Sequence, residues 1–581
     1  MIELQGIPVS PGVAIGPALV LDTEGYRVPN ILVPAGEAEG EFTRLYHACK
    51  AVGSRLRENQ ASTSAAAGED TGNIFAAQLQ MLNDPRLHTE LRRRIQNDHE
   101  SAAYAVNRVL QNYAGALRRL ANPLLADRAE DVLDIEKQLL FELGAVSRPP
   151  LADLTEPTIV LARTLTPSET ANLDRDHVQG FCTETGGSGG HTAIVAKGLE
   201  LPAVVGIGRF IDAVSNGTLI IVDGDRGRVV VDPDEETIAS YRKRRKARVS
   251  LSERLAELHE LPAETADGVR VRLSANIEFP HETKAAVARG ADGIGLYRTE
   301  FLYLSSEEEP SEEDHYNAYS EVVRAMHGRP VVIRTLDLGA DKMGHRPLAE
   351  NEHNPCLGLR SIRLSLRNLD LFRPQLRAIL RAAVHGDIRV MFPLITTIAE
   401  LRQARMLLNL VAEDLKDADV PFRSDIPVGM MVEVPAAVIM LDMFAKEVDF
   451  LSIGTNDLAQ YTLAVDRGNE YVADLYQSSD PAVLRLIQSC VKISKSSDVP
   501  LSVCGEMSSM PGRALLLLGL GVRSLSVPPS AIPTIKKTIR SVSITRCEEI
   551  AKRAMTLEAA REVDMYLLNQ IAELVPELVV E

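Results

Sequence analysis

The chain has 581 residues and a formal net charge of −17, with 45% hydrophobic and 25% charged residues. This length exceeds one ordinary hydrophobic core, so several domains are expected, and the composition is that of a globular protein. The acidic balance argues against nucleic acid as the main partner. It requires any anion site to be built from locally clustered arginines, and it would steer a basic protein partner toward the surface.

Signals for membrane insertion or secretion are missing from the sequence. No stretch approaches the about 18 uncharged apolar residues of a spanning helix. Residues 1–16 lack the basic and apolar regions of a secretory signal. The six cysteines are not paired at short spacing, which argues against a zinc knuckle or a disulfide framework and fits a reducing cytosol. We therefore expect a cytoplasmic protein.

The N-terminal half alternates between strand and helix patterns. Residues 1–22 hold short apolar runs broken by Gly and Pro, which predict strands and turns. In 23–148, apolar residues such as Leu79 and Leu82 recur at helical spacing, which predicts a bundle of long helices. Residues 149–233 mix β-rich runs with helix-like stretches. We expect 1–22 and 149–233 to form one small α/β domain that is interrupted by the helical insertion.

Residues 234–262 are dense in Arg, Lys and Glu and contain the run Tyr241-Arg-Lys-Arg-Arg-Lys. A basic run can indicate nucleic-acid binding. Acidic residues flank this one on both sides, however, so a solvated linker helix is the favoured interpretation.

Residues 263–581 predict a (β/α)8 barrel, because eight β-like runs alternate with helical stretches over roughly 280 residues. The runs are Val269–Asn276, Gly293–Tyr297, Val331–Thr335, Arg389–Pro393, Val428–Val434, Phe450–Gly454, Pro500–Cys504 and Val522–Val527. In such barrels the chemistry lies at the C-terminal ends of the strands. Polar residues of this sequence collect at those ends, which supports the assignment.

Arginines at the strand ends predict a site for a phosphate ester. Arg298 follows the second run, and Arg334 lies at the end of the third. Arg467 comes after the sixth run, and Arg360 and Lys342 are further candidates. A phosphate ester needs planar donors that bind two oxygens at once, which Arg supplies and Lys does not.

Acidic residues and a cysteine at neighbouring strand ends complete this set. Glu433 and Asp457 are suited to a hard octahedral cation such as Mg²⁺, which takes one or two protein carboxylates plus substrate oxygens. Cys504 is a candidate proton donor or nucleophile.

Each of these residues also has a plainer interpretation. Arg298 could be a surface ion-pair residue, Asn456-Asp457 a helix N-cap, and Cys504 a core residue. Glu433 is harder to explain without a function, because it stands in an apolar run and an unpaired buried carboxylate is costly. The alignment of all these residues at strand ends favours a catalytic site.

A glycine-rich segment, Thr185-Gly-Gly-Ser-Gly-Gly-His191-Thr-Ala-Ile-Val-Ala-Lys197, leads into a predicted helix. Glycines let the backbone approach an anion, and the start of a helix offers free N–H groups to it. A neutral imidazole at this place can attack phosphorus. The alternative is a flexible turn with His191 at the start of a helix, and the phosphate site elsewhere in the chain favours the nucleophile.

Taken together, these segments resemble enzyme I, the phosphoenolpyruvate–protein phosphotransferase of the bacterial phosphotransferase system. Matching stretches include Ser10-Pro-Gly-Val-Ala-Ile-Gly, Gly295-Leu-Tyr-Arg-Thr-Glu-Phe-Leu-Tyr and Ser452-Ile-Gly-Thr-Asn-Asp-Leu-Ala-Gln-Tyr-Thr-Leu-Ala-Val-Asp-Arg-Gly-Asn. Such stretches follow the family's order over nearly the whole chain, and the last is highly specific.

The resemblance implies a role for each candidate residue. His191 would accept the phosphoryl group and Thr170 would orient it. Cys504 would protonate the enolpyruvate as pyruvate leaves. Phosphoenolpyruvate would be bound by Arg298, Arg334, Asn456 and Arg467, with Arg360 close by, and Mg²⁺ would be held by Glu433 and Asp457.

The resemblance also implies partners and motion. An HPr-like phosphocarrier would dock on the helical insertion, the barrel would form a homodimer, and the phosphohistidine domain would swivel between barrel and carrier. One departure concerns the reactive segment. The family usually has Thr-Ser where this chain has Gly189-Gly190, so two possible hydroxyl donors next to His191 are absent.

Other functions compete with this one. Pyruvate phosphate dikinase and phosphoenolpyruvate synthase share a similar His domain and barrel, but they need a nucleotide-binding domain for which the residues before His191 are too few and too helical. The nitrogen-related branch usually adds an N-terminal sensory domain, whereas this sequence begins directly with the Ser10 segment. A regulator that only senses phosphoenolpyruvate is motivated by Gly189-Gly190 and opposed by Cys504, which sensing does not need.

Overall fold

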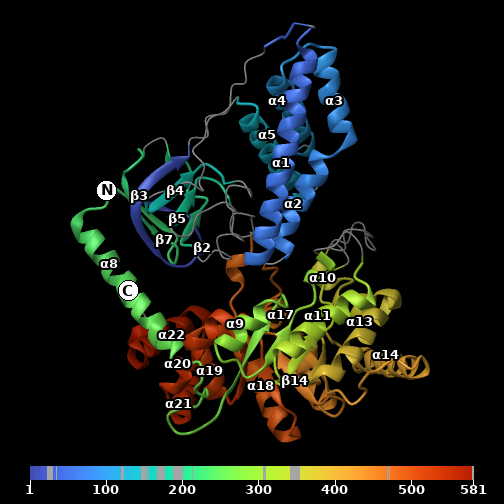
Figure 1. Ribbon diagram of the computed structural model, residues 1–581. Coiled ribbons are helices and arrows are strands. Elements are labelled where there is room, and N and C mark those ends of the chain that lie inside the picture. The colour runs from blue at the N-terminus through green and yellow to red at the C-terminus, as the bar shows by residue number, and fades with distance from the viewer. Residues whose placement is uncertain are drawn as a thin grey trace. The chain divides into compact units, whose positions relative to one another are not determined.

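A computed structural model of the chain describes most of its residues (Figure 1). The described residues are 1–21, 31–34, 36–67, 69–118, 123–144, 154, 156–165, 177–186, 201–211, 214–304, 309–339, 354–467, 469 and 471–578. They fall into two compact units, Met1–Arg248 and Val249–Glu581.

A helical bundle, which begins after the first three strands in sequence, forms one part of the N-terminal unit, as predicted (Figure 1). Asp84 caps one of its helices by accepting a 2.7 Å hydrogen bond from the backbone N–H of Arg86, and Pro85 occupies the first helical position, where no N–H is needed. Leu87, Leu91 and Ile95 recur at helical spacing and are buried in the bundle core. The helices are α1 (Ala38–Ala67), α2 (Glu69–Leu82), α3 (Pro85–Gln96), α4 (Ala102–Arg118) and α5 (Pro123–Glu142).

The other part of this unit is a mixed sheet that the helical bundle interrupts in sequence. Its described strands lie in the order β1-β8-β7-β3-β4-β5-β6-β2, in which β3, β4, β5 and β6 run parallel. The N-terminal strands thus pair with strands that follow the bundle, as expected from the sequence. The strands are β1 (Ile2–Gln5), β2 (Ile7–Ser10), β3 (Val13–Leu21), β4 (Thr158–Ala162), β5 (Val178–Thr183), β6 (Ala203–Val205), β7 (Leu219–Asp223) and β8 (Arg228–Val231).

The basic run predicted to be a linker lies within one helix, α8 (Glu235–Ala256). Arg244 donates a 2.9 Å hydrogen bond to the buried Asp223 at the end of β7. Tyr241, whose ring lies beneath the Arg244 guanidinium, packs against the sheet. The basic run therefore serves in part to hold α8 to the sheet.

In the described part of the C-terminal unit, eight parallel strands close a barrel, as predicted. Each predicted run overlaps one of them. The strands are β9 (Arg272–Ile277), β10 (Ile294–Tyr297), β11 (Val331–Arg334), β12 (Ile388–Phe392), β13 (Val428–Val432), β14 (Phe450–Ile453), β15 (Leu501–Val503) and β16 (Ser524–Val527).

Helices connect and surround the barrel strands (Figure 1). They are α9 (Glu282–Ala288), α10 (Phe301–Leu304), α11 (Glu312–Ala325), α12 (Ser361–Arg367), α13 (Leu369–Ala382), α14 (Ile398–Asp417), α15 (Pro435–Ile439), α16 (Leu441–Phe444), α17 (Thr455–Leu463), α18 (Pro481–Ser497), α19 (Pro511–Leu520), α20 (Ile532–Arg540), α21 (Ile544–Ala554) and α22 (Ala560–Leu574). Among the described residues, no helix combines the length and apolarity needed to cross a bilayer. All six cysteines are free thiols.

Several strands end earlier than the apolar runs suggested. The fifth run was predicted to include Glu433 and Val434, but β13 ends at Val432. The chain leaves the strand ladder here because Pro435, which has no N–H, begins α15. Cys504 likewise follows β15 rather than ending it. These side chains therefore belong to the loops at the mouth of the barrel.

Gly519 on α19 provides a test of how tightly the outer helices pack. A methyl group added there would overlap the backbone carbonyl of Cys547 on α21, so one helix must shift. We expect Gly519→Ala to lower the free energy of unfolding of the barrel unit by about 1–3 kcal/mol, measured by chemical denaturation. Gly40→Ala in α1 is the control, because its added methyl has no described neighbour within 4 Å. A Gly519 variant as stable as wild type would contradict this packing.

Candidate active site at the mouth of the barrel

Arg334, the last residue of β11, is held by two carboxylates. Its guanidinium lies 2.9 Å from Glu300 Oε1 and 2.8 Å from Asp337 Oδ2, and its side chain is only 10% exposed. Asp337 also accepts a 3.2 Å hydrogen bond from Arg360. Burial opposes ionisation of Asp337, but Arg334 and Arg360 outweigh it and lower the pKa of this carboxyl. The two arginines therefore keep their charge and their orientation.

Two further predicted arginines lie in more exposed positions. Arg298, directly after β10, forms an ion pair with Glu278 at the end of β9, and its side chain is 35% exposed. The guanidinium of Arg467, after α17, lies 4.0 Å from Glu506 and is 45% exposed. The surface ion pair considered for Arg298 is thus observed. Both partners are exposed carboxylates, which water can solvate if an anionic ligand takes their place.

Glu433 is almost completely enclosed, at 1% exposure. Its Oε1 accepts a 2.6 Å hydrogen bond from the backbone N–H of Leu394, which follows β12. A Cβ atom at Gly454, which follows β14, would lie 2.6 Å from Glu433 Oε2, so glycine is what lets the carboxylate reach this place. Burial raises the pKa of Glu433 well above its ordinary value, and the charges of Asp457 and Asp337 raise it further.

Asp457 lies in the first turn of α17 and is also buried. Burial raises its pKa, and the charge of Asp337 adds to the effect. Glu433 and Asp457 are therefore two enclosed carboxylates that repel each other when both are ionised. A divalent cation between them would remove this repulsion.

The donor set fits magnesium better than zinc. Within the described ranges, His, Cys, Asp and Glu side chains form no group of three that could hold a metal ion. Magnesium needs only one or two carboxylates and completes its octahedron with water and substrate oxygens. A structural zinc ion would require four protein ligands.

The helix-cap alternative for Asn456 and Asp457 is wrong. The residue that precedes α17 is Gly454, and both polar residues lie inside the first turn. Asn456 uses its side-chain oxygen to accept a 3.0 Å hydrogen bond from the backbone N–H of Glu506. This bond joins the loops that follow β14 and β15.

Cys504 faces the interior of the barrel mouth and is buried. Ser452 of β14 donates a hydrogen bond to its Sγ at 3.2 Å, and the thiol is 3.6 Å from the carbonyl oxygen of Ile453. Burial raises the pKa of Cys504, so the protonated thiol is the resting form. Of the two roles predicted for this residue, a proton donor fits this environment and a thiolate nucleophile does not.

A buried polar network that the sequence did not reveal supports the arginine side of the site. The backbone N–H of Leu336 donates to Gln375 Oε1 at 3.0 Å, which fixes the orientation of the amide. Gln375 Nε2 then donates to Thr299 and to Tyr319, each at 3.1 Å. Thr299 in turn donates to the carbonyl oxygen of Arg334 at 3.0 Å. The ends of β10 and β11 are thus joined through one glutamine of α13.

His315 of α11 completes this network. The Tyr319 hydroxyl lies 2.9 Å from His315 Nδ1, and the Tyr303 hydroxyl lies 3.2 Å from His315 Nε2. Burial lowers the pKa of His315 to about 4, which keeps the ring neutral, so that one ring nitrogen donates and the other accepts. No periodicity or motif distinguished Gln375, Tyr319 or His315 in the sequence.

The structure thus brings most of the predicted barrel residues to one place. Arg298, Arg334, Glu433, Asn456, Asp457 and Cys504 lie at or just beyond strand ends on the C-terminal side of the barrel. Arg360 and Arg467 lie further along the chain, and they reach this side through their carboxylate neighbours Asp337 and Glu506. Glu300 and Asp337, also at strand ends, prove to be the partners of Arg334. Three predicted residues, Thr170, His191 and Lys342, lie outside the described residues.

Three family models match successive parts of the chain. They are described as "PEP-utilising enzyme, N-terminal" (residues 5–128), "PEP-utilising enzyme, mobile domain" (residues 154–227) and "PEP-utilising enzyme, PEP-binding domain" (residues 252–544). The third covers the whole barrel mouth.

Curated relatives match along nearly the full length. "Phosphoenolpyruvate-protein phosphotransferase" of Geobacillus stearothermophilus is 40% identical over 96% of this chain and 96% of its own length. The protein of the same name from Staphylococcus aureus (strain Mu50 / ATCC 700699) is 39% identical over 98% and 99%. A solution structure entitled "NMR solution structure of Enzyme I (nEIt) protein using two 4D-spectra" covers 42% of this chain and 98% of its own, with 34% identity and a TM-score of 0.37.

The low pKa of His315 predicts a specific pH dependence of stability. Between pH 6.5 and about 4, the unfolded histidine binds a proton that the folded one does not, so stability falls as the pH is lowered. The slope contributed is about 1.4 kcal/mol per pH unit. We expect His315→Gln to lose this slope when the free energy of unfolding of the barrel is measured between about pH 7 and pH 5.

The exposed His259, changed to Gln, controls for the substitution itself. An unchanged slope in the His315 variant would mean that this ring is protonated in the folded protein.

Proposed function

The chain belongs to the phosphoenolpyruvate-protein phosphotransferase family, and we propose that it transfers the phosphoryl group of phosphoenolpyruvate to His191 and then to a histidine of a small phosphocarrier protein, releasing pyruvate. In this role it would carry out the first step of a sugar phosphotransferase system. Family membership rests on the full-length relatives. The observation that carries the chemistry is the presence of oriented arginines and of two enclosed carboxylates at one barrel mouth.

The arginines match the substrate's two anionic groups. Phosphoenolpyruvate carries a phosphate and a carboxylate, and planar guanidinium groups bind both well. Arg334 and Arg360 are preset by Asp337 and bring fixed positive charge into the site, while the more exposed Arg298 and Arg467 close on the ligand with Asn456. Lys342 is proposed as a further phosphate contact. Phosphoryl transfer depends mainly on such positioning and charge neutralisation.

Magnesium is the cofactor that best fits Glu433 and Asp457. When bound, it would offset the charges of these carboxylates and of the substrate's oxygens. The backbone N–H of Leu394 and the space at Gly454 hold the Glu433 carboxylate in place. Glu433 and Asp457 are thus proposed as two cation ligands that repel each other when both are ionised. That repulsion favours binding of the cation.

Cys504 is proposed to protonate C3 of the enolpyruvate. Its thiol is protonated at rest, since burial raises its pKa, and it lies among apolar side chains at the top of the barrel interior. The proton leaves the sulfur as the C3–H bond forms, and the enolate collapses to the ketone of pyruvate.

His191 is proposed as the phosphoryl acceptor, with Thr170 orienting the imidazole. The support is the glycine-rich segment before His191 and the match of residues 154–227 to the mobile-domain model. Since the phosphoryl group must reach both substrate site and carrier, the small α/β domain has to move between them.

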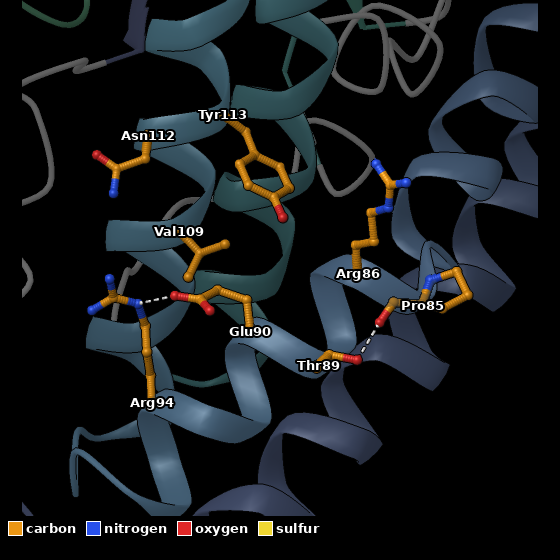
Figure 2. Close-up of a pocket in the computed structure, with 8 residues that line it drawn as sticks. All are labelled: Pro85, Arg86, Thr89, Glu90, Arg94, Val109, Asn112 and Tyr113. Atoms are coloured by element: carbon orange, nitrogen blue, oxygen red, sulfur yellow. Dashed lines mark hydrogen bonds and ion pairs between the residues drawn. The ribbon is translucent and has the colours of Figure 1, made fainter.

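A hollow on the helical bundle is a fitting place for the carrier. It has a volume of about 450 Å³ and lies between α3 and α4, lined in part by Arg86, Glu90 and Tyr113. Figure 2 shows Tyr113 facing Arg86 and Glu90 across it. Pro85 also lines a second hollow, at the end of α2. Tyrosine and arginine are the residue types that most often anchor a protein partner.

The barrel is proposed to form a homodimer. Ile439, Met440 and Met443, on or next to α15 and α16, are exposed, as are Met406 and Leu410 of α14. Large apolar side chains grouped on a surface are typical of contacts between subunits. The cytoplasm is the proposed location, since all six cysteines are free thiols.

The relatives and the residues of the site disfavour the competing functions. The full-length relatives are protein phosphotransferases, which disfavours the dikinase and synthase. A sensor without turnover has no use for the buried thiol at Cys504. It remains the outcome to be excluded by experiment.

Labelling with radioactive phosphoenolpyruvate and magnesium tests the function directly. We expect base-stable, acid-labile label on the wild-type chain, none on His191→Ala, and little when magnesium is removed with a chelator. Phosphoenolpyruvate that binds without labelling either protein would establish the sensor. Label on His191→Ala would show that another residue accepts the group.

Tyr113→Ala tests the carrier site. Loss of an anchoring aromatic should raise the KM for the carrier about tenfold or more, while labelling of His191 by phosphoenolpyruvate is unchanged. Tyr46→Ala is the matched control, because Tyr46 is an exposed tyrosine of α1 that does not line the hollow. Equal effects of the two substitutions would place the carrier elsewhere.

A further inference from the structure

Ser452 and Ser502 form a short hydrogen-bonded chain that ends on the sulfur of Cys504. Ser452 and Ser502 are partners across β14 and β15. Ser502 Oγ lies 3.0 Å from Ser452 Oγ, and Ser452 Oγ lies 3.2 Å from Cys504 Sγ. Ser452 is 1% exposed, so water does not compete for these bonds.

One assignment of the hydroxyl protons gives this chain a consistent direction toward the sulfur. Ser502 donates to Ser452, with the carbonyl oxygen of Leu451 at 3.3 Å as its alternative acceptor. Ser452 has one proton and donates it to the sulfur. The thiol proton of Cys504 has the carbonyl oxygen of Ile453 as its acceptor at rest. The sulfur thus accepts one hydrogen bond and retains one proton to give away.

The proposed reaction leaves charge on this sulfur. The S–H bond breaks, the C3–H bond of pyruvate forms, and the sulfur keeps the electron pair of the broken bond. An anionic sulfur in a buried site needs donors, because burial disfavours the charged form. Arg334 and Arg298 favour the thiolate from a distance and Glu433 disfavours it, whereas Ser452 contacts the atom itself.

We propose that Ser452 is a positioning residue whose hydroxyl stabilises the thiolate of Cys504 after the proton has passed to the substrate. This inference rests on the proposed role of Cys504 as proton donor. Ser502 strengthens the effect by polarising the Ser452 hydroxyl. In the reverse direction, the same bond maintains the thiolate that removes a proton from the methyl group of pyruvate.

Ser452→Ala tests the proposal in the full-length chain. A hydrogen bond to a charged group is worth a factor of about ten to a hundred, so single-turnover pyruvate formation should slow by that factor near neutral pH. The alkaline limb of its pH profile should move upward by about one unit or more, since the thiol becomes a weaker acid. The KM for phosphoenolpyruvate should stay the same, because Ser452 does not contact the substrate.

A second measurement follows the thiol without catalysis. Modification of Cys504 by methyl methanethiosulfonate, quantified on its peptide by mass spectrometry between about pH 7 and pH 11, reports the thiolate directly. Its inflection should move upward in Ser452→Ala and return toward wild type in Ser452→Thr, which keeps the hydroxyl. Ser502→Ala, measured in the same way, should give a smaller shift in the same direction and serves if Ser452→Ala does not fold.

The outcomes separate this inference from the function on which it rests. If Cys504→Ala abolishes pyruvate formation and the serine variants leave the thiol inflection in place, the role of Ser452 is wrong and that of Cys504 stands. If Cys504→Ala forms pyruvate at the wild-type rate, both roles fail. A loss of rate in Ser452→Ala with an unmoved inflection and a raised KM would identify a merely structural residue.

Discussion

The barrel mouth is organised by the need to compensate charge that is removed from water. Arg334 is enclosed, and Glu300 and Asp337 neutralise it at hydrogen-bonding distance. The loss of either carboxylate would leave Arg334 and Arg360 short of one counter-charge, and an unbalanced buried charge is among the costliest changes a protein can undergo. Burial raises the pKa values of Glu433 and Asp457, and the nearby arginines lower them too little to reverse this effect. The protein thus balances the charge of one half of the site by itself, and a bound cation would balance the other half.

Neutral groups hold the charged ones in place. Gln375 joins the chain after β10 to the chain after β11 by hydrogen bonds to Thr299 and Leu336, and the neutral ring of His315 bonds to Tyr319 behind it. Glu433 is also held in place by a neutral group, because the backbone at Gly454 approaches its carboxylate closely and leaves no space for a side chain. A fully hydrogen-bonded network of this kind is rigid, which suits a reaction whose barrier is lowered mainly by orientation.

The neighbours of each buried acidic group determine whether it is ionised, and Asp337 and Cys504 differ in this respect. Asp337, next to two arginines, has a lowered pKa and stays ionised, so it serves as an anchor. The thiol of Cys504 is buried and protonated at rest, so it has a proton to give. Burial opposes ionisation in both cases. The difference lies in the neighbours, which are guanidinium groups for Asp337 and serine hydroxyls for Cys504.

The sequence by itself determined the eight barrel strands and the candidate residues at their ends, because apolar runs and the residues that follow them are local features. It could not determine the partners of those residues. Glu300 and Arg334 are 34 positions apart, Thr299 and Gln375 are 76 apart, and Ser452 and Cys504 are 52 apart, so only closure of the barrel brings them into contact. The burial of Cys504, which favours the proposed proton donor over a thiolate nucleophile, is likewise a property of the folded chain. His191, Thr170 and Lys342 lie outside the described residues and remain predictions from the sequence. Contacts between distant residues depend on strand register and helix packing, which are properties of the folded chain that no single segment encodes.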